Sequence, residues 1–386
     1  MASTSSSQAH TIGVIGGGQL AWMLASAAKQ LGLNLIVQTP SPNDPAVALA
    51  HDTVLAPITD VDATATLAAQ CDVITFENEF IDVFGLQHLA AKGTQFRPAL
   101  EVLTLVLDKL DQRRFFDRIG LSNPRYCSLD DHESADTLLA KANEMSFPLV
   151  MKTRRLGYDG YGTFIIADPL QLQTAWDKTG QAPILLEEFV SFQQELAVMV
   201  ARSERGEIAV FPAVETRQVN QICRDVIAPA RVSPEVATTM EHLARTLAEA
   251  LPLVGIVGIE CFLTQEGRVL VNEIAPRTHN SGHYTIDACE TSQFEQQLRA
   301  ISNRPLGPTA LNCPQALMVN LLGLDLSLAE HQNRLHQLRN IPDAQVYWYE
   351  KAPRPGRKLG HITLRLRAND DPAQVAAEVE HLWYDG

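Results

Sequence analysis

Two glutamates inside apolar, strand-like runs constrain this chain more than any other feature of its sequence. Glu260 lies in GIVGIECFLT and Glu273 lies in VLVNEIAPR, and only Gln-Glu-Gly-Arg separates the two runs. We expect a two-residue turn at Glu266 and Gly267, which makes the runs an antiparallel hairpin. In that register Glu260 lies directly opposite Glu273, and opposed residues project from the same face of a sheet, about 5 Å apart.

Two carboxylates this close together repel each other unless a cation lies between them. Their oxygen atoms suit Mg²⁺ that is also bound to substrate phosphates, with Mn²⁺ as the alternative metal. The competing interpretation is a pair of solvated strand glutamates, and the apolar flanking residues argue against it. The sequence therefore predicts that Glu260 and Glu273 are metal ligands.

The charge balance limits the partners of the chain. Its 386 residues carry a formal net charge of −14 at pH 7, which argues against non-specific binding of nucleic acid. An anionic substrate must therefore be held by a local basic cluster. We expect no membrane contact, because no apolar run is long enough to span a bilayer. Residues 1–8 read as a Ser-rich tail and not as a signal peptide.

The cysteines indicate a reducing compartment. They are far apart in the sequence and form no C-x-x-C pair: Cys71, Cys127, Cys223, Cys261, Cys289 and Cys313. We interpret them as reduced thiols of a cytoplasmic protein, and not as a disulfide framework or a zinc site.

The order of the apolar runs divides the chain into regions. Residues 11–35 read as a strand, a glycine turn, a helix and a second strand, and CDVITF continues the alternation. Strands that alternate with helices predict a parallel sheet. A second region begins near Asp108 in the helix-like stretch DKLDQRRFFDRIG and continues as strand-rich sequence. The Pro-containing stretch after Ser302 suggests a second junction.

The segment GGGQLA, at 16–21, matches the glycine pattern of dinucleotide sites. A nicotinamide site usually also needs an acidic residue after the second strand, where this chain has Gln38, so we do not expect NAD. A phosphate at the helix N-terminus is one interpretation of these glycines. A purely structural turn is the other.

A second glycine-rich segment, GYDGYG at 157–162, can fold over phosphates and present backbone N–H groups to them. Its spacing is not that of a Walker-type P-loop. Lys152 precedes it on a buried strand, where a lone ammonium is costly. Either a phosphate or a salt bridge to a neighbouring acid accounts for this lysine.

Two further segments concentrate polar side chains. APRTHNSGH follows the second glutamate and supplies Arg277, His279, Asn280 and His283. Arg277 can hold an oxyanion through two hydrogen bonds, and the histidine spacing matches no common zinc motif, so we expect no zinc. EKAPRPGRKLGH is the densest basic stretch: Lys351, Arg354, Arg357, Lys358 and His361. It is either a solvated turn or a phosphate-recognition loop.

Together these motifs resemble a known family. The carboxylate pair in ECF and NEIAPR, the LVMK…GYDGYG strand and loop, and LLEEFVSFQQE are similar to the ATP-grasp superfamily. Within it, GGGQL, TFENE, GYDG, APRTHNSGHYT and PGRKLGHI resemble the N5-carboxyaminoimidazole ribonucleotide synthetases of purine biosynthesis, from about Thr11 to Leu366. The alternative is the formate-dependent glycinamide ribonucleotide transformylases, which typically carry His-Asp in place of His279-Asn280. A non-catalytic dinucleotide-binding module is a third hypothesis.

The resemblance implies a mixed α/β and α+β fold with several domains. Residues 1–8 are then a disordered tail and 9–107 a doubly wound, Rossmann-like parallel-sheet domain. Residues 108–302 are an ATP-grasp domain with a mobile lid at about 118–186, and 303–386 are a small C-terminal domain. Since the family is commonly dimeric, the resemblance also implies a homodimer.

The resemblance further assigns residues to each ligand. The ATP site comprises Lys109, Lys152, Gly157, Tyr158, Asp159, Gly160, Tyr161, Gly162, Thr163, Glu187, Glu188, Phe189, Val190, Glu195, Gln218, Asn272 and Glu273. In it, 157–163 is the lid loop, 187–190 is the hinge that reads adenine, and Glu195 binds the ribose hydroxyls. The aminoimidazole ribonucleotide is held by Gln19, Leu20, Glu77, Tyr158, Asn280, Lys351, Arg357 and Lys358. Two positions depart from the family: Lys109 often is Arg, and Gln218 often is His.

The reaction implied is that of ATP, bicarbonate and 5-aminoimidazole ribonucleotide, which gives the N5-carbamate, ADP and phosphate. Transfer of the γ-phosphoryl group converts bicarbonate to carboxyphosphate, while Mg²⁺ and Lys152 offset the charge. Arg277 and His279 hold the bicarbonate, and Asp159 accepts the proton of the attacking amine. Closure of the lid excludes water.

Overall fold

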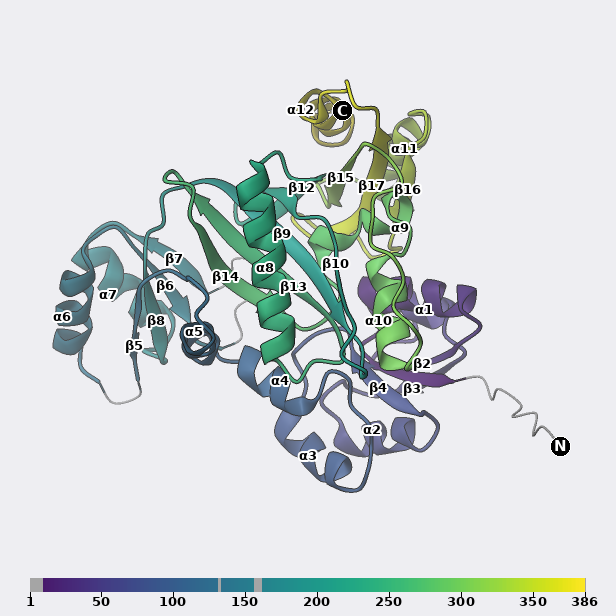
Figure 1. Ribbon diagram of the computed structural model, residues 1–386, viewed down its shortest axis with the longest axis horizontal. Coiled ribbons are helices and arrows are strands. Elements are labelled where there is room, and N and C mark those ends of the chain that lie inside the picture. Colours follow the sequence, from purple (N-terminus) through teal and green to yellow (C-terminus); the bar gives the residue numbers. More distant parts are fainter. Residues whose placement is uncertain (1–9, 131–132, 156–161, 386) are drawn as a thin grey trace.

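The computed structural model describes residues 10–130, 133–155 and 162–385, which fold into three parts in chain order (Figure 1). The lid loop expected at 157–163 therefore lies mostly outside the described residues, together with Gly157, Tyr158, Asp159, Gly160 and Tyr161.

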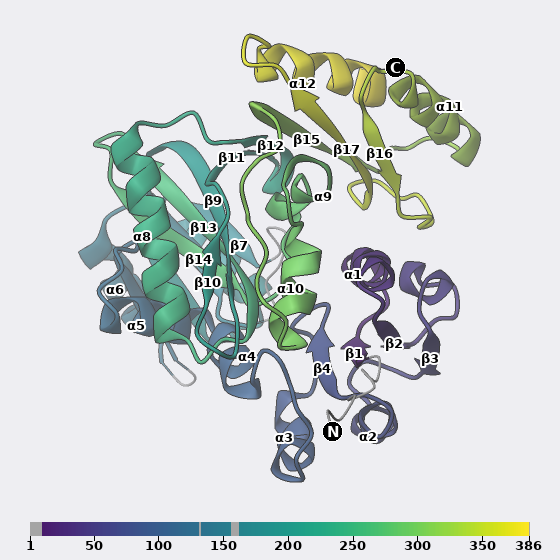
Figure 2. The same cartoon turned by 45° about the vertical axis from the view of Figure 1, so that its right-hand side comes forward.

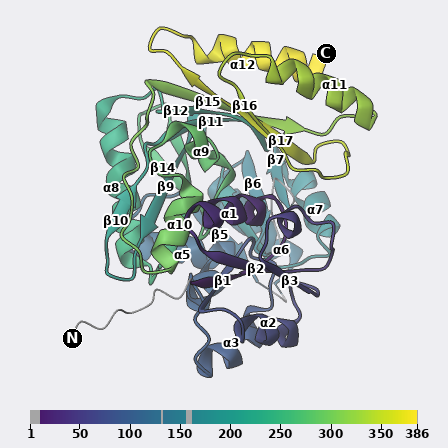
Figure 3. The ribbon, with the colours of Figure 1, turned by 90° about the vertical axis from the view of Figure 1, so that its right-hand side faces the viewer.

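The N-terminal part is a parallel sheet between two layers of helices, as the strand–helix alternation predicted. Its strands lie in the order β3-β2-β1-β4. Ile12 and Val14 of β1 pack under α1, whereas Ile15 packs with α2 and α3 on the opposite face (Figure 3). The elements are β1 (Thr11–Ile15), α1 (Gln19–Gln30), β2 (Asn34–Thr39), η1 (Pro45–Ala48), β3 (Asp52–Leu55), α2 (Val61–Ala68), β4 (Val73–Phe76), α3 (Val83–Ala91) and α4 (Leu100–Val106).

A small antiparallel sheet projects from the central part at the position expected for the lid (Figure 1). Its strand order is β5-β8-β6-β7, and α6 and α7 contribute Leu138 and Trp176 to its apolar core. The elements are α5 (Lys109–Arg118), which precedes the sheet, β5 (Tyr126–Leu129), α6 (Ala135–Met145), β6 (Leu149–Thr153), β7 (Thr163–Ile166), α7 (Pro169–Lys178) and β8 (Ile184–Glu188).

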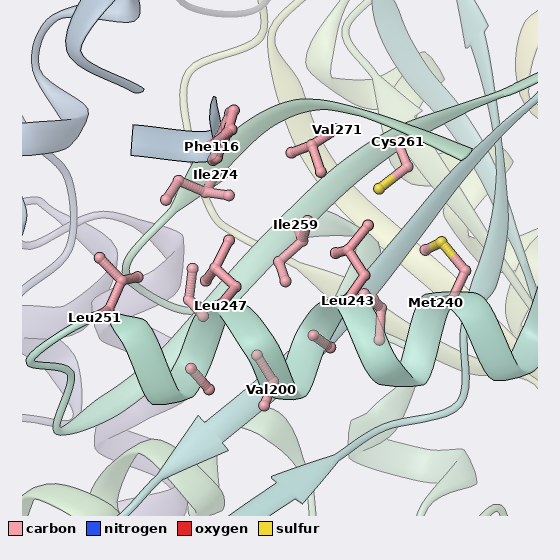
Figure 4. Close-up of a cluster of buried hydrophobic side chains, with 14 of the residues drawn as sticks. Phe116, Val200, Met240, Leu243, Leu247, Leu251, Ile259, Cys261, Val271 and Ile274 are labelled. Carbon is pink, nitrogen blue, oxygen red and sulfur yellow. The ribbon is translucent and has the colours of Figure 1, made fainter. Parts of the chain in front are cut away.

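The largest sheet carries the predicted glutamate hairpin, and helix α8 covers one of its faces (Figure 4). Ser233 caps α8 by accepting a hydrogen bond from the N–H of Val236. Met240, Leu243 and Leu247, three and four positions apart, then face the sheet. The elements are β9 (Phe192–Arg202), β10 (Ile208–Val210), β11 (Val214–Val219), β12 (Ile222–Ala228), α8 (Pro234–Ala250), β13 (Gly255–Thr264), β14 (Val269–Ala275), η2 (Asn280–Gly282), α9 (Thr285–Ala288) and α10 (Gln293–Ile301).

The C-terminal part extends this same sheet. The strand order is β14-β13-β9-β11-β12-β15-β17-β16, so the antiparallel pair of β12 with β15 joins the central and C-terminal parts. Helices α11 and α12 cover the C-terminal strands, and the loops at the other end approach α1 (Figure 2). The elements are β15 (Gln315–Leu322), α11 (Leu328–Arg339), β16 (Gln345–Trp348), β17 (Lys358–Leu366), α12 (Pro372–Glu380) and η3 (His381–Asp385).

Two consequences concern function. Because the main sheet is continuous, residues of the C-terminal part are held in register with the glutamate hairpin by backbone hydrogen bonds. In the described residues, none of the helices combines the length and the apolar character needed to cross a bilayer.

Candidate active site

A pocket of about 1010 Å³ lies where the three parts meet, beside the small sheet β5-β8-β6-β7, which is called the lid sheet below after its predicted role. Among the described residues, most of those predicted for the site line it: Gln19, Leu20, Glu77, Lys109, Lys152, Thr163, Glu187, Glu188, Phe189, Val190, Glu195, Gln218, Glu260, Asn272, Glu273, Arg277, His279, Asn280, Lys351 and Lys358. Gly162 and Arg357 were also predicted and are not among the lining residues.

The glutamate hairpin forms with the predicted pairing but with a different turn. Glu260 lies opposite Glu273, and Leu263 pairs with Val269. The N–H of Thr264 then donates to the carbonyl of Arg268, so the turn consists of the three residues 265–267 and not of two. Gly267 closes it at a φ of 80°, a left-handed conformation that glycine adopts without strain. The expected two-residue turn is therefore wrong.

A bulge at Asn272 restores the register that the longer turn shifts. Glu260 pairs with Glu273 and the next residue, Cys261, pairs with Val271, which leaves Asn272 as the extra residue of β14. Consecutive residues of a regular strand point to opposite faces, whereas here both Asn272 and Glu273 line the pocket. The bulge therefore supplies an additional polar group beside the two carboxylates.

The carboxylates have separate partners in the structure. Glu273 Oε2 lies 2.7 Å from Lys109 Nζ, and the charge of Lys109 lowers the pKa of Glu273 to about 2. Glu260 Oε1 lies 3.2 Å from His279 Nε2. Burial, aided by the charge of Glu260, raises the pKa of nearby Glu195 to about 7. Several carboxyl groups thus lie close together at this end of the pocket. A cation bound there would reduce the repulsion between them.

Lys152 is held by the salt bridge that the sequence left as the alternative to a phosphate. Its Nζ lies 2.8 Å from Glu187 Oε2 and donates a hydrogen bond of 3.0 Å to Asn272 Oδ1. Arg113 lies 2.6 Å from the other oxygen of Glu187 and donates to the carbonyl of Val271. Burial alone would raise the pKa of Glu187, but Arg113 and Lys152 outweigh it and lower the pKa to about 2.

Arg113 belongs to this site although sequence reasoning did not select it. It lies in DQRRFFDR beside a second arginine, and nothing in that pattern distinguishes the two. In the structure Arg113 is buried, whereas the Arg114 side chain is 62% exposed. Only the helix orientation that buries Phe116 reveals which arginine faces Glu187.

The N-terminus of α1 already binds a carboxyl group of the protein. The carboxylate of Glu77 accepts hydrogen bonds from the N–H groups of Gly18 and Leu20, at 2.6 and 3.1 Å. A Cβ on Gly16 would lie 2.5 Å from the Cβ of Glu77, so the glycines allow this close approach. The N–H groups at the positive end of this helix thus bind a side chain of the protein itself.

Gln38, at the position where a nicotinamide site would need an acid, has a structural role. Its Nε2 donates to the carbonyls of Pro57 and Asp60, at 2.7 and 3.1 Å, and its Oε1 accepts from Thr64. The fully buried amide therefore joins β2 to the segment before α2 and leaves its polar atoms satisfied.

The segment after β14 turns back over the pocket. Arg277 Nε lies 2.9 Å from Oε1 of Glu79, a residue of TFENE that was not selected from the sequence. His279 Nδ1 lies 2.8 Å from Ser281 Oγ, which fixes the imidazole ring. Asn280 exchanges hydrogen bonds with Asn320 of β15. Each predicted residue of this segment thus has a neighbour that sets its orientation.

The basic stretch contributes some but not all of its residues. Lys351 donates a hydrogen bond to Gln19 Oε1 and so joins the C-terminal and N-terminal parts at the pocket. Burial lowers the pKa of Lys351 to about 8. Lys358 is the first residue of β17 and lines the pocket. Arg357 instead donates a hydrogen bond of 3.1 Å to the backbone carbonyl of Ala352.

Aromatic residues line the pocket beside the hinge. Phe189 and Phe192 are 42% and 40% exposed, and the Phe192 ring stacks on Phe262 with centroids 4.9 Å apart. Exposed aromatic rings of this kind provide flat apolar surfaces for a planar ligand.

The metal prediction can be tested against the donor set. In the described ranges no group of three or more His, Cys, Asp and Glu side chains is close enough to enclose a metal ion. The opposed Glu260 and Glu273, with the Asn272 amide oxygen, nevertheless fit Mg²⁺, which is usually held by one or two carboxylates together with substrate phosphates.

Family models match the chain in three consecutive ranges. Residues 9–106 match the ribonucleotide synthetase preATP-grasp domain, and residues 114–294 match the ATP-grasp domain. Residues 316–375 match the phosphoribosylaminoimidazole carboxylase C-terminal domain.

Full-length relatives agree with these matches. The N5-carboxyaminoimidazole ribonucleotide synthase of Synechococcus elongatus is 53% identical over 379 residues, which cover 96% of this chain and 95% of that protein. A crystal structure of an N5-carboxyaminoimidazole ribonucleotide synthetase with ADP is 37% identical, with a TM-score of 0.89 and 97% of each chain covered. The Aspergillus clavatus enzyme, in complex with ADP and 5-aminoimidazole ribonucleotide, is 30% identical with a TM-score of 0.88, and 98% of this chain and 97% of that chain are covered.

Proposed function

Since the chain belongs to the N5-carboxyaminoimidazole ribonucleotide synthase family of ATP-grasp ligases, we propose that its pocket carboxylates 5-aminoimidazole ribonucleotide in purine biosynthesis. The substrates are ATP, bicarbonate and the ribonucleotide, and the products are the N5-carbamate, ADP and phosphate. One observation carries the proposal: a single pocket joins Lys152 and the opposed glutamates to Arg277, Asn280 and the C-terminal lysines.

ATP occupies the end of the pocket between the lid sheet and the main sheet. Its phosphates meet Lys109 and Lys152, whose ammonium groups are held by Glu273 and Glu187. The adenine lies against the hinge at 187–190, with the exposed ring of Phe189 beside it. Lys109 stands where relatives often have Arg. It therefore offers the phosphates a compact ammonium group and not a planar guanidinium that can donate two parallel hydrogen bonds.

Glu260 and Glu273, with Asn272 beside them, would hold Mg²⁺ that binds together with the nucleotide. The bound cation supplies positive charge that stabilises the γ-phosphoryl group during transfer. Glu195 lies near Glu260 and accepts hydrogen bonds from the ribose hydroxyls in its ionised form. Burial and, to a lesser extent, the charge of Glu260 raise the pKa of Glu195, and this contribution of Glu260 supports a cation-binding role for this end of the pocket.

Bicarbonate lies against Arg277 and His279, next to the γ-phosphoryl group. One of its oxygens attacks phosphorus, ADP leaves, and carboxyphosphate results. Arg277 is already oriented by Glu79, and His279 by Ser281, so little reorganisation is needed when the anion binds. The amine of the ribonucleotide then attacks the carboxyl carbon, the C–O bond to phosphate breaks, and Asp159, outside the described residues, takes the amine proton.

The ribonucleotide occupies the end between α1 and the C-terminal loops. Asn280, Lys351 and Lys358 line that end, and burial of Lys351 next to Gln19 indicates a preformed site for an anion. The chain acts as a homodimer, as its family commonly does. Light scattering coupled to size-exclusion chromatography measures this, and a monomer at micromolar concentration would contradict it.

An ADP-release assay tests the function. We expect ADP formation that requires ATP, Mg²⁺, bicarbonate and 5-aminoimidazole ribonucleotide together. Release that instead requires formate and glycinamide ribonucleotide would assign the chain to the transformylases. NADH binding without any ATPase activity would favour a dinucleotide-binding module.

A variant pair locates the activity in this pocket. Arg277→Ala should lower the rate about 100-fold, because it removes a donor to the developing anion. Arg245→Ala is the matched control, since Arg245 forms an ion pair with Glu241 on the exposed surface of α8. Equal rates for the two variants would contradict the role of Arg277.

A further inference from the structure

A fully buried asparagine lies behind the ribonucleotide end of the pocket. Asn320 is the polar residue of MVNLLG in β15, and its side chain has no solvent exposure. It does not line the pocket among the described residues, whereas Asn280 does. A buried amide in an apolar strand is costly unless its donors and acceptor are paired.

Asn320 and Asn280 pair through two hydrogen bonds. Asn280 Nδ2 donates to Asn320 Oδ1 at 2.9 Å, and Asn320 Nδ2 donates to Asn280 Oδ1 at 2.7 Å. The pair connects the segment after β14 to a strand of the C-terminal part, 40 residues further along the chain. An amide pair alone does not fix the direction of either side chain, because both amides could turn over together and keep both bonds.

A third hydrogen bond removes this ambiguity. Asn320 Nδ2 also donates to the backbone carbonyl of Cys223, at 2.9 Å. A carbonyl oxygen can only accept, so the NH₂ group of Asn320 must face it, and the direction of the paired Asn280 amide follows. Each amide has two donors and two lone pairs, so the pairing leaves Asn280 one N–H and one lone pair for a ligand.

We propose that Asn320 is a positioning residue, which fixes the direction in which Asn280 presents its remaining donor and acceptor to the ribonucleotide. This inference rests on the proposed function, in which Asn280 contacts 5-aminoimidazole ribonucleotide. The C-terminal part then contributes to recognition in two ways: its lysines reach the ligand, and Asn320 orients a residue of the central part.

Asn320→Leu tests the inference because leucine is close in shape and removes all three hydrogen bonds. We expect the KM for the ribonucleotide to rise about tenfold to a hundredfold, as expected when a buried polar group loses its partner. The KM for ATP should stay within about twofold, since the nucleotide end of the pocket is unchanged. A general structural defect would instead change both KM values or only kcat.

Gln296→Leu is the matched control. Gln296 is equally buried, and its amide exchanges two hydrogen bonds with the backbone of Gly307, at 2.6 and 2.9 Å, away from the pocket. This variant should melt at a lower temperature and keep both KM values. A rise in the ribonucleotide KM of the same size as in Asn320→Leu would overturn the inference.

The double variant with Asn280→Ala gives the decisive readout. If Asn320 acts through Asn280, adding Asn320→Leu to Asn280→Ala should change the ribonucleotide KM by no more than about twofold. Multiplied effects would show that Asn320 acts independently and would overturn the inference. If Asn320→Leu fails to fold, the same measurements are made on Asn320→Asp, which keeps the shape and loses the NH₂ group that donates to Cys223 and to Asn280.

The outcomes separate the two proposals. If the unaltered chain forms no ADP in response to the ribonucleotide, the proposed function fails and this inference fails with it. If the unaltered chain is active and Asn320→Leu has a normal ribonucleotide KM, only the inference is wrong.

Discussion

Replacing Glu187 by glutamine should destabilise the chain and weaken ATP binding together. The carboxylate of Glu187 is buried between two cations, Arg113 at 2.6 Å and Lys152 at 2.8 Å. A neutral amide keeps the shape but leaves both cations without a buried counter-charge. Lys152, whose pKa burial already lowers, should then lose its fixed position or its proton.

The structure gives the size of the effect. Burial alone would raise the pKa of Glu187, but Arg113 and Lys152 lower it from 4.5 to about 2, which corresponds to about 3 kcal/mol in favour of the charged form. Breaking a buried ion pair by removing one partner costs about 3–5 kcal/mol, in agreement with that value. Because the folded-state pKa is lowered, this stabilisation is present above pH 4.5 and is lost as the pH falls towards 2.

Thermal melting measures this loss of stability, with a variant of the neighbouring residue Glu188 as the control. Glu188 follows in the same strand and pairs with Arg125, whose side chain is 68% exposed, so Glu188→Gln should cost at most about 1 kcal/mol. We expect Glu187→Gln to melt on the order of 10 °C lower and Glu188→Gln roughly 3 °C lower or less. Glu187→Gln should also raise the KM for ATP strongly, because Lys152 loses its buried counter-charge. Since Glu188 lies in the predicted hinge, this control is read by melting temperature alone. Equal melting temperatures for the two variants, or an unchanged KM for ATP in Glu187→Gln, would refute the reasoning.

Three further predictions concern the same pocket. Glu273→Gln should remove most activity and keep the fold, because an amide is a poor Mg²⁺ ligand. Normal turnover of this variant at millimolar Mg²⁺ would contradict the assignment of Glu273 as a metal ligand. Arg357→Ala should raise the KM for the ribonucleotide about tenfold to a hundredfold and leave the KM for ATP unchanged. A raised KM for ATP with an unchanged KM for the ribonucleotide would assign Arg357 to the ATP site. Burial and Glu260 raise the pKa of Glu195 from 4.5 to about 7, so the nucleotide-free chain loses stability as the pH rises through this range. Glu195→Gln should flatten that decline in thermal melts, and an unchanged decline would show that another group causes it.

The glutamate hairpin was predicted from the sequence in its strands and pairing, but not in its turn. The alternation of apolar residues around Glu260 and Glu273 identified two strands and their pairing, because burial imposes a period of two on each strand. The turn length was wrong because Gly267 fits more than one turn type. The extra residue at Asn272 restores the pairing of Glu260 with Glu273 that the longer turn would have shifted. A bulge interrupts the alternation of a strand, so the sequence pattern does not reveal it.

Contacts between distant segments were the least predictable part of the site. Arg113 lies in α5 and Asn320 in β15, yet their partners Glu187 and Asn280 lie 74 and 40 positions away in the sequence. The glycine turn is a similar case. Its glycines mark a close approach at a helix N-terminus, and the group that approaches in the structure is the side chain of Glu77, 59 positions from Gly18.

The most direct test of the account follows an oxygen atom from bicarbonate. If the pocket activates bicarbonate by phosphoryl transfer, an oxygen of bicarbonate becomes the bridging atom of carboxyphosphate and stays with phosphorus when the carbamate forms. Turnover with freshly dissolved [¹⁸O]bicarbonate, ATP and 5-aminoimidazole ribonucleotide should therefore yield phosphate that carries one ¹⁸O atom, detected by its ³¹P NMR isotope shift. Unlabelled phosphate from an enzyme that turns over would contradict the account, because ATP would then be hydrolysed by water and not by bicarbonate.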